Sequence, residues 1–480
     1  MDDNDKKTVY SYHTFLLPFR WEDLNMDKFV KKLNISDNGW SEILWNKEKN
    51  FFDADCDRRI EYNEYQYFHE NVRNAIYGNE NNDIVRNFAF RYKYFTDNGV
   101  PISFVIKKEK EWTLKVNAIR LKLYNTGVGI LIYELENYNY KDIEDVLKIN
   151  EYGRRIAIPY VSVFNNSCSL IADVIEITGI AKCEFSNEIA KFTDKNVNYN
   201  FISPIITEIL GKNFTFKDEN NKIKCHVIGD DRMFVCCLFD NDSFCQDLTI
   251  WDSTNKKYAW EMDCIEKTHW NQSKLYEFVF IDGDGISCID RNMRLELLKK
   301  ALYTRFSEYN PETPKDRTNY GTITAVTHHS FVCVPTYSGE IATFLTMRIQ
   351  MAIIVLTQRA SIISLAHRAS KLSQKFQNNE KILDKQIPKI QKLQEEYVAF
   401  QNQLLFFEIT AQEQGVELYK LFQESLYVPN EEDKLKQQLS NLHEIANLYG
   451  ERKSNTMMSR LAIIGGVLAL LQVLVPFFRS

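Results

Sequence analysis

Hydrophobic and polar positions follow one pattern up to about Pro335 and another after it. Before Pro335, short apolar runs with many β-branched and aromatic residues alternate with stretches of helical spacing. The runs that predict strands are Phe104–Ile106, Val128–Tyr133, Tyr276–Ile281 and Thr322–Val334, and those that predict helices lie around Trp21–Leu33, Lys141–Leu147 and Met293–Phe306. We therefore expect residues 1–337 to form an α/β or α+β body.

The segment VFIDGDGISCI places a Gly-Asp-Gly sequence between two β-rich runs. Glycine and aspartate are typical of tight turns between antiparallel strands. We expect a hairpin here, with Asp282 and Asp284 as turn residues rather than as a catalytic pair.

After residue 338, apolar residues recur at helical spacing and glycine and proline become rare. The pattern predicts helices over about 339–377, 379–427 and 431–460, with a kink or late start of the second at Pro388. In the third helix, the 4-3-4-3 spacing of a coiled-coil seam is followed by Leu435, Leu439, Leu442, Ala446 and Tyr449. We expect a long antiparallel helical stalk over residues 338–460.

The stretch Leu461–Phe478 carries no charged residue. As one helix it is about 27 Å long, which matches the hydrocarbon core of a bilayer. The alternative is a buried core helix. Arg452, Lys453 and Arg460 precede the stretch and only Arg479 follows it, so the positive-inside rule places the bulk of the chain in the cytoplasm. The N-terminus shows no signal-peptide pattern. The fold expected is α+β, with a single C-terminal transmembrane helix in a bacterial inner membrane.

Composition narrows the function classes. The chain has 480 residues and a net charge of −6, which argues against direct nucleic-acid binding. Its ten cysteines show no CxxC spacing and fit buried, reduced thiols. His328 and His329 beside Cys333 lie in a β-rich run, where neighbouring side chains point to opposite faces, so we expect no metal site. No residue pattern indicates a cofactor or an enzyme active site.

The segment Asn150–Arg155 is the best candidate for binding an anion. Adjacent Arg154 and Arg155 follow a glycine, and guanidinium groups bind phosphate with two parallel hydrogen bonds. Surface or interface salt bridges are the alternative for both arginines. Thr126–Gly129 contains GxG but lacks a third glycine and a following helix, which favours a tight strand entry over a phosphate loop.

If the chain assembles around its last helix, one stripe of that helix lines a pore. Gln472 is strongly polar inside an otherwise apolar run, and such groups usually face a partner helix or water. Residues at helical spacing before Gln472 complete the predicted lining: Leu468, Gly465, Leu461 and Met458. The alternative is that Gln472 bonds between helices without an open pore.

Several short motifs together resemble one family. They are Tyr12–Trp21, Thr126–Leu131 with Glu136 and Asn137, Ile149–Arg155, Gln358–Ser361 and Thr410–Gly415. With the stalk pattern, they resemble the CorA-type divalent-cation channels, and more specifically a divergent bacterial branch found with type III CRISPR systems. The 480 residues contain no Gly-Met-Asn signature, and their pattern predicts one membrane helix where CorA transporters have two, which puts selective magnesium transport in doubt.

The resemblance implies a homo-oligomer in membrane lipid that is triggered by a nucleotide second messenger, such as an S-adenosylmethionine–AMP conjugate, and that passes ions or permeabilises the membrane in antiviral defence. A divalent cation is a possible further partner. Three alternatives remain open: a divalent-cation transporter-like protein, a tail-anchored oligomeric scaffold without a pore, and a membrane-tethered hydrolase or nucleotidyl enzyme.

Overall fold

The chain is described from a computed structural model. The residues whose placement is described are 8–22, 26–33, 39–43, 58–78, 84–90, 102–164, 167–191, 201–217, 219, 222–249, 251–252, 254, 256–261, 272–283, 287–303, 321–374 and 380–474.

The chain divides into two compact units. The first comprises Met1–Ser361 and Gln403–Val428, and the second comprises Ile362–Asn402 and Pro429–Ser480. Each unit is described by itself. An α+β body with a mixed β-sheet, followed by long C-terminal helices, is confirmed.

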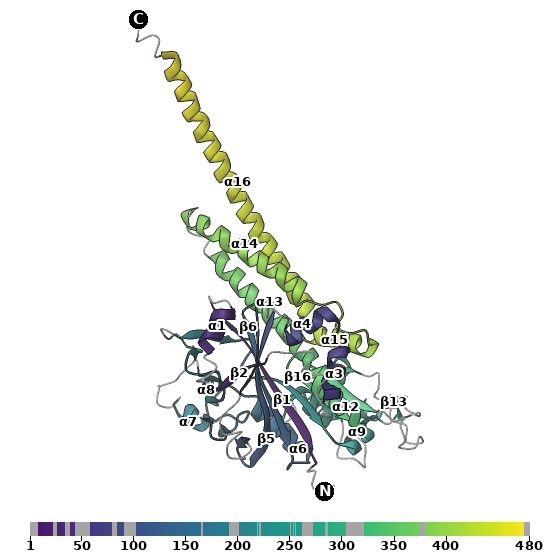
Figure 1. Cartoon of the computed structure of the whole chain (residues 1–480). Coiled ribbons are helices and arrows are strands. Elements are labelled where there is room, and N and C mark those ends of the chain that lie inside the picture. Colours follow the sequence, from purple (N-terminus) through teal and green to yellow (C-terminus); the bar gives the residue numbers. More distant parts are fainter. Residues whose placement is uncertain are drawn as a thin grey trace. The chain divides into compact units, whose positions relative to one another are not determined.

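A mixed 14-stranded sheet forms the centre of the first unit (Figure 1). Its main path runs β14-β15-β16-β11-β1-β6-β5-β4-β7-β8. The strands of this sheet are β1 (Ser11–Trp21), β2 (Trp40–Glu42), β3 (Val85–Phe90), β4 (Ser103–Lys107), β5 (Glu111–Tyr124), β6 (Val128–Asn137), β7 (Val174–Ile177), β8 (Ala181–Glu184), β9 (Phe214–Thr215), β10 (Ile223–Val227), β11 (Phe234–Phe239), β14 (Leu302–Tyr303), β15 (Thr322–Val326) and β16 (Ser330–Pro335). A separate small sheet pairs β12 (Trp251–Asp252) with β13 (Lys257–Tyr258).

Strand β1 is central, and its middle residues Phe15–Phe19 are apolar on both faces because both faces are buried. It pairs antiparallel with β6 over ten residues, from Ser11↔Asn137 to Arg20↔Val128. On its other edge it pairs first with β11, up to Leu16, and then with β10, from Phe19. Pro18 has no N–H to donate, and it lies where β1 changes partner, which explains a proline in a central strand.

The helices of both units have the following bounds: α1 (Met26–Leu33), α3 (Arg58–Tyr67), α4 (Glu70–Tyr77), α6 (Ile143–Gly153), α7 (Phe185–Ala190), α8 (Pro204–Leu210), α9 (Asp242–Thr249), the 3₁₀ turn η1 (Ala259–Glu261), α10 (Gln272–Phe280), α11 (Arg291–Ala301), α12 (Ser338–Thr343), the π-helical turn η2 (Phe344–Arg348), α13 (Ile349–Gln374), α14 (Glu380–Gln403), α15 (Glu413–Ser425) and α16 (Val428–Leu474).

Helix α6 positions the residues of most interest. Its apolar residues Ile143, Val146, Leu147 and Ile149 are buried in the core, next to β1, β4 and β11. It approaches β1 closely at Gly153, where a Cβ atom would lie 2.8 Å from Cζ of Phe15. Only glycine fits at that contact without displacing a buried ring.

Replacing Gly153 by alanine is expected to lower the free energy of unfolding by about 1–3 kcal/mol, because the added methyl group overpacks the contact between α6 and Phe15. The urea midpoint read by tryptophan fluorescence measures this effect, since all seven tryptophans lie within residues 21–270, in the first unit. Gly450→Ala is the control, because a Cβ there meets no atom within 4 Å. An unchanged midpoint in Gly153→Ala would show that α6 shifts away from β1 without cost.

Two of the predicted strands are wrong in type or extent. Tyr276–Ile281 lies largely in helix α10, so the predicted hairpin around Gly283 does not form from two strands. Leu275, Phe278 and Val279 are buried at helical spacing, and Tyr276 stacks on Phe280 one turn later with ring centroids 4.6 Å apart. Tertiary packing therefore overrides the β propensity of these aromatic residues.

Thr322–Val334 is not one strand but two, β15 and β16, which pair antiparallel around a turn at Thr327–His329. The predicted helix ends also shift. Trp21 ends β1 rather than starting a helix, and the helix predicted over Met293–Phe306 runs from Arg291 to Ala301.

The first long helical stretch was predicted over 339–377 and runs over Gly339–Gln374. It is long and apolar enough to cross a membrane, but 78% of its apolar window is buried inside the protein. Its buried polar residues Gln358 and Ser361 bond to Leu404 and Thr126 of the first unit. These contacts are those of a core helix.

The second predicted helix, 379–427, is wrong as a single helix. Helix α14 begins at Glu380, before Pro388, and ends at Gln403, and α15 begins only at Glu413. The break is held by side chains: Gln358 Nε2 donates to the Leu404 carbonyl at 2.8 Å, and Tyr419 Oη donates to the Phe406 carbonyl at 2.9 Å. These side chains donate to backbone carbonyls that would accept from backbone amides in a continuous helix, and a sequence pattern cannot show such contacts.

Helix α16 is a continuous helix of 47 residues that begins at Val428 rather than Glu431, and all of it after Val428 belongs to the second unit. Its predicted seam is buried at Leu435, Leu439, Leu442 and Ala446. Near its start, the Tyr397 hydroxyl of α14 donates to the Glu432 carboxylate at 2.5 Å.

Candidate functional site

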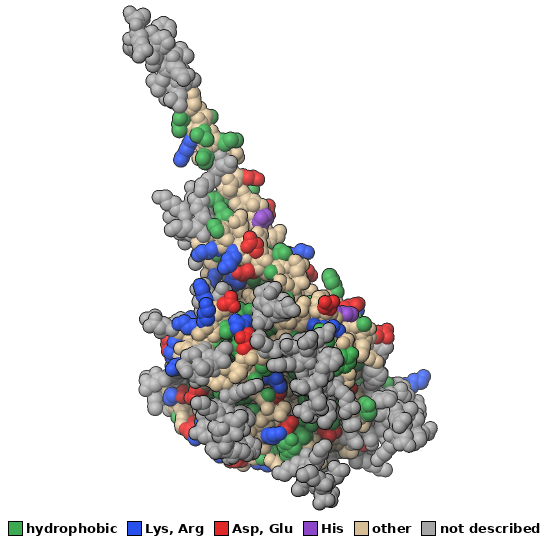
Figure 2. Space-filling model, viewed as in Figure 1, with side chains coloured by type: hydrophobic (Ala, Val, Ile, Leu, Met, Phe, Trp, Pro, Cys, Tyr) green, Lys and Arg blue, Asp and Glu red, His purple; other side chains and the backbone are tan. Residues whose placement is uncertain are grey.

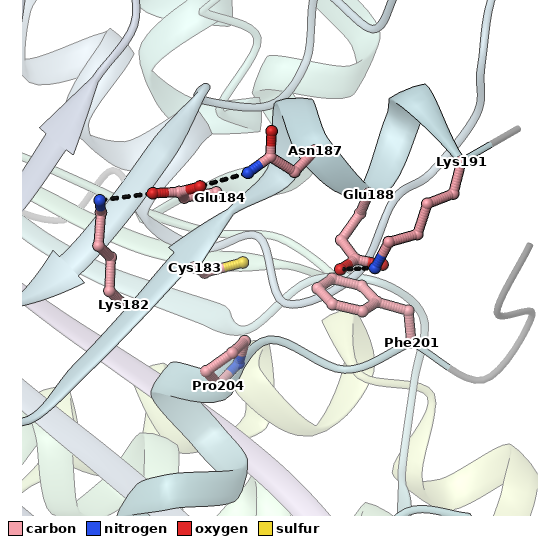
Figure 3. A pocket seen from close by; sticks show the side chains of 8 residues that line it. All are labelled: Lys182, Cys183, Glu184, Asn187, Glu188, Lys191, Phe201 and Pro204. Atoms are coloured by element: carbon pink, nitrogen blue, oxygen red, sulfur yellow. Dashed lines mark hydrogen bonds and ion pairs between the residues drawn. The ribbon is translucent and has the colours of Figure 1, made fainter. Parts of the chain in front are cut away.

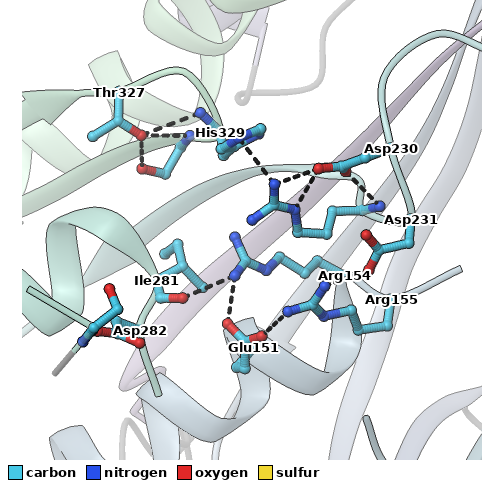
Figure 4. Close-up of polar contacts among 12 residues, drawn as sticks. Glu151, Arg154, Arg155, Asp230, Asp231, Ile281, Asp282, Thr327 and His329 are labelled. Atoms are coloured by element: carbon cyan, nitrogen blue, oxygen red, sulfur yellow. Dashed lines mark hydrogen bonds and ion pairs between the residues drawn. The ribbon is translucent and has the colours of Figure 1, made fainter. Parts of the chain in front are cut away.

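Asn150, Arg154 and Arg155 lie together at the end of α6. Glu151, three and four residues before the arginines, accepts from both guanidinium groups. Arg155 also pairs with Asp231, and Arg154 Nη2 donates to the Ile281 carbonyl at 2.8 Å (Figure 4). We call Glu151, Arg154, Arg155 and Asp231 the arginine cluster.

The backbone fixes the two sides of the arginine cluster. Arg155 forms a β-bridge with Arg232, Ile156 N donates to the Asp231 carbonyl at 2.9 Å, and Met233 N donates to the Arg154 carbonyl at 2.8 Å. The end of α6 is thus joined to the loop between β10 and β11. These main-chain hydrogen bonds hold the Arg155 guanidinium group and the Asp231 carboxylate next to each other.

Three of the four side chains of the arginine cluster are almost fully buried, and the fourth, Asp231, is 18% exposed. The side chains of Arg154, Arg155 and Glu151 are 2–4% exposed. Burial, opposed by Glu151, lowers the pKa of Arg154 to about 10. Burial also lowers the pKa of Arg155, but Glu151 and Asp231 outweigh it and the net shift is upward. Both guanidinium groups are therefore charged at neutral pH.

The guanidinium groups are incompletely satisfied. Among the described residues, Nε and Nη1 of Arg154 and Nε of Arg155 have no hydrogen-bond acceptor. A buried donor without an acceptor costs about 1–3 kcal/mol. An anion with several oxygens would supply acceptors here, but it would have to compete with Glu151 or Asp231 for the arginines.

A second polar group adjoins the arginine cluster. Arg232 pairs with Asp230, and its Nη2 lies 3.1 Å from Nε2 of His329. Because the guanidinium can only donate, Nε2 is the acceptor and His329 is neutral. Burial and the charge of Arg232 lower the pKa of His329 to about 3.

Asn150 belongs to a different, fully buried network. Its Oδ1 accepts from Nδ1 of His13 at 2.7 Å, and Ser11 Oγ lies 2.8 Å from Nε2 of the same ring. Asn137 Nδ2 donates to Ser11 Oγ at 2.8 Å. The network joins β1, β6 and α6, and it brings together residues of three motifs that carry the family resemblance.

The predicted pore-lining residues lie on α16. Met458 and Leu461 are 66% and 57% exposed, and a Cβ at Gly465 would meet no atom within 4 Å. Leu468 and Gln472 fall within the helix, but their side chains lie outside the described residues, as does the chain after Leu474. The predicted membrane span over 461–478 stays a prediction.

The remaining sequence segments considered as phosphate, metal or catalytic sites lie in or beside turns where the structure describes them. Thr126 and Gly127 form the turn of the β5–β6 hairpin, with φ +80° at Gly127, as a tight strand entry requires. His328 and His329 lie in a turn rather than in a strand, with ring centroids 4.9 Å apart. No group of three metal-ligating side chains occurs in the part of the chain that the structure describes. Asp282 accepts from the Ser287 amide, and Asp284 lies outside the described residues.

A surface pocket of about 430 Å³ lies beside β8 and α7 (Figure 3). Two ion pairs, Lys182–Glu184 and Lys191–Glu188, neutralise its charges. Burial raises the pKa of its Cys183 thiol to about 12, so no thiolate forms at neutral pH. The described residues that line the pocket offer neither an unpaired charge nor a nucleophile, so the pocket is a weaker candidate than the arginine cluster.

Sequence reasoning missed Glu151, Asp230, Asp231 and Arg232, and it considered His329 only as a metal ligand. The spacing of Glu151 to the two arginines is a signal for an ion pair on one helix face. The other four come from loops distant in sequence, and no local pattern connects them to α6.

In comparisons with known proteins, no family model, no curated protein and no solved structure matches this chain.

Proposed function

We propose that this chain is a homo-oligomeric, ligand-gated membrane channel or membrane-permeabilising effector. In this proposal the arginine cluster of the cytoplasmic body binds an anionic nucleotide messenger, and the last part of α16 inserts into the membrane. The observation that carries the proposal is the exposed apolar surface of α16.

Five large apolar side chains between positions 457 and 464 of α16 are 55–66% exposed: Met457, Met458, Leu461, Ile463 and Ile464. They gather near the described end of the helix (Figure 2). Full burial of each such side chain stabilises by about 1.5–3 kcal/mol. A contiguous apolar surface is typical of a membrane or protein contact, and the uncharged sequence that follows it, 461–478, has the length of a membrane span.

The arginine cluster supports the input side of the proposal. Its two guanidinium groups are held in fixed positions, and they have donors left for an oxygen-rich ligand. A phosphate group that takes the place of Glu151 or Asp231 would alter the contacts between α6 and the β10–β11 loop. The resemblance to CRISPR-associated CorA-like proteins suggests an S-adenosylmethionine–AMP conjugate as the messenger. Such a ligand opens a channel only if it binds the open state more tightly than the closed one.

Ion flux through liposomes that contain the inserted, full-length protein tests the proposal. We expect flux only when a messenger is added, with the S-adenosylmethionine–AMP conjugate as the first probe and Mg²⁺ among the ions. Gln472→Leu is expected to reduce the flux at least tenfold, because it removes the polar side chain within the apolar run.

Gln438→Leu is the matched control, since it makes the same change at an exposed position of α16 outside that run. It should leave the flux unchanged. An absence of flux under every condition, from protein shown to be inserted and oligomeric, would reject the channel and leave the tail-anchored scaffold.

A further inference from the structure

A continuous set of contacts leads from the arginine cluster to the start of α16. Arg232 is its first member. Its backbone pairs with that of Arg155, and its guanidinium bonds to both Asp230 and His329. Any shift of the end of α6 against the β10–β11 loop therefore moves Arg232.

His328 and His329, which we call the histidine pair, are the next members. Their rings meet edge to face, with centroids 4.9 Å apart. The turn that carries them is held firmly: Thr327 Oγ1 accepts from the His329 and Ser330 amides, and Ser330 Oγ donates to the Val279 carbonyl at 2.5 Å. The backbone of the histidine pair is fixed in this way, and its contact with Arg232 is made by the side chain of His329.

His328 contacts the end of α15 and the residue before α16. Its Nδ1 donates to the Ser425 carbonyl at 3.3 Å, and its ring lies 5.5 Å from that of Tyr427. Tyr427 has φ +57°, a left-handed conformation that is uncommon for residues other than glycine. Such residues persist only where their surroundings hold them, and they are common at switch points.

Tyr427 lies in the short connection between α15 and α16. Helix α15 ends at Ser425, α16 begins at Val428, and the chain passes from the first unit to the second after Val428. A change of the φ and ψ angles at Tyr427 would alter the path of the chain into α16.

We propose that the histidine pair couples the arginine cluster to the first turns of α16, through Arg232 on one side and Ser425 and Tyr427 on the other. This coupling would regulate the anion site of the proposed function, and its biological role therefore rests on that function. Its test uses neither a ligand nor ion flux, so the two can fail separately.

In physical terms, the histidine pair has two states, and contacts with Arg232 on one side and with Ser425 and Tyr427 on the other influence which state it adopts. In the state described, neutral His329 accepts from Arg232, and His328 donates to the last carbonyl of α15. Removal of the Arg232 contact frees His329. Because the two rings are in contact, His328 then loses its fixed position, and Tyr427 loses the ring that packs against it.

Hydrogen–deuterium exchange of the full-length protein in detergent tests the coupling. The amides to follow are those of residues 432–438, the first in α16 that have acceptors within the helix. Arg232→Gln is expected to speed their exchange at least tenfold. In a His328→Leu background, where the connection is already broken, the same substitution should change it less than twofold.

Arg120→Gln is the control, because Arg120 also pairs with a carboxylate, Glu134, but lies on the sheet without a contact to the histidine pair. It should leave residues 432–438 unchanged. If Arg232→Gln unfolds the first unit, seen as a loss of native tryptophan fluorescence, Arg232→Lys replaces it, since lysine keeps the charge but cannot hold Asp230 and His329 together.

Two outcomes would overturn the proposal. One is a faster exchange that stays within residues 228–233 and 327–330 and does not reach α16. The other is an equal effect of the Arg232 substitution with and without His328, which would mean that the effect reaches α16 by another route.

Discussion

Replacing Glu151 by glutamine is expected to lower the free energy of unfolding of the first unit by about 3–5 kcal/mol. Glu151 is the carboxylate that Arg154 and Arg155 share, and all three side chains are almost fully buried. Without its charge, two guanidinium groups remain in the interior, and among the described residues only Asp231 still pairs with one of them. The loss of one partner from a buried ion pair costs more than the pair contributes, because it leaves an uncompensated charge.

The urea midpoint from tryptophan fluorescence measures this loss in the full-length protein. Glu134→Gln is the matched control. Glu134 pairs with Arg120 at 2.8 Å, but the two side chains are 26% and 46% exposed, so the change should cost less than about 1 kcal/mol.

A double variant separates charge from packing. Glu151→Gln combined with Arg154→Met removes one positive charge together with the negative one, and it should be less destabilised than the sum of the two single variants. Strict additivity, or equal effects of Glu151→Gln and Glu134→Gln, would contradict the electrostatic role of Glu151.

The sequence was a good guide wherever hydrophobic spacing alone decides the structure. The long helix over Gly339–Gln374 and the seam of α16 follow directly from apolar residues at helical intervals. Strand β6 was predicted because β-branched residues fill a buried strand. In these elements local propensity and tertiary packing agree.

The sequence misled where long-range contacts decide. Helix α10 was predicted as a strand because aromatic and β-branched residues are frequent in it. Its residues that pack into the core, however, recur at helical spacing. The break between α14 and α15 depends on hydrogen bonds from Gln358 and Tyr419, which are distant along the chain. A local pattern cannot show either effect.

The candidate site was predictable only in its α6 half. Arg154 and Arg155 could be found as adjacent arginines after a glycine, and the spacing of Glu151 indicates its ion pairs with them, but the partners outside α6 could not be found. Asp231 and Ile281 reach them only because β11 and the end of α10 are folded against α6. Burial also changes the interpretation, because the arginines are part of an internal ion-pair network rather than an open surface site.

Acid is expected to destabilise the first unit through His13, whose fully buried ring bonds to Asn150 and Ser11. Burial lowers the pKa of His13 from 6.5 to about 4, although the bond to Asn150 opposes the shift. Between these two values the unfolded chain binds a proton that the folded protein does not. The contribution of neutral His13 is therefore complete above pH 6.5 and falls as the pH approaches 4, by up to about 3 kcal/mol.

The slope of the unfolding free energy against pH isolates this group. In His13→Gln the slope between pH 6.5 and 4 should decrease by about 1.4 kcal/mol per pH unit, the value for one proton. His329, whose pKa is also lowered by burial, contributes to the slope in both proteins and cancels in the difference. The comparison of slopes is unaffected by any constant loss of packing in the variant. Equal slopes in the two proteins would mean that His13 is protonated as readily in the fold as in the unfolded chain, and that the Ser11–His13–Asn150 network does not hold it neutral.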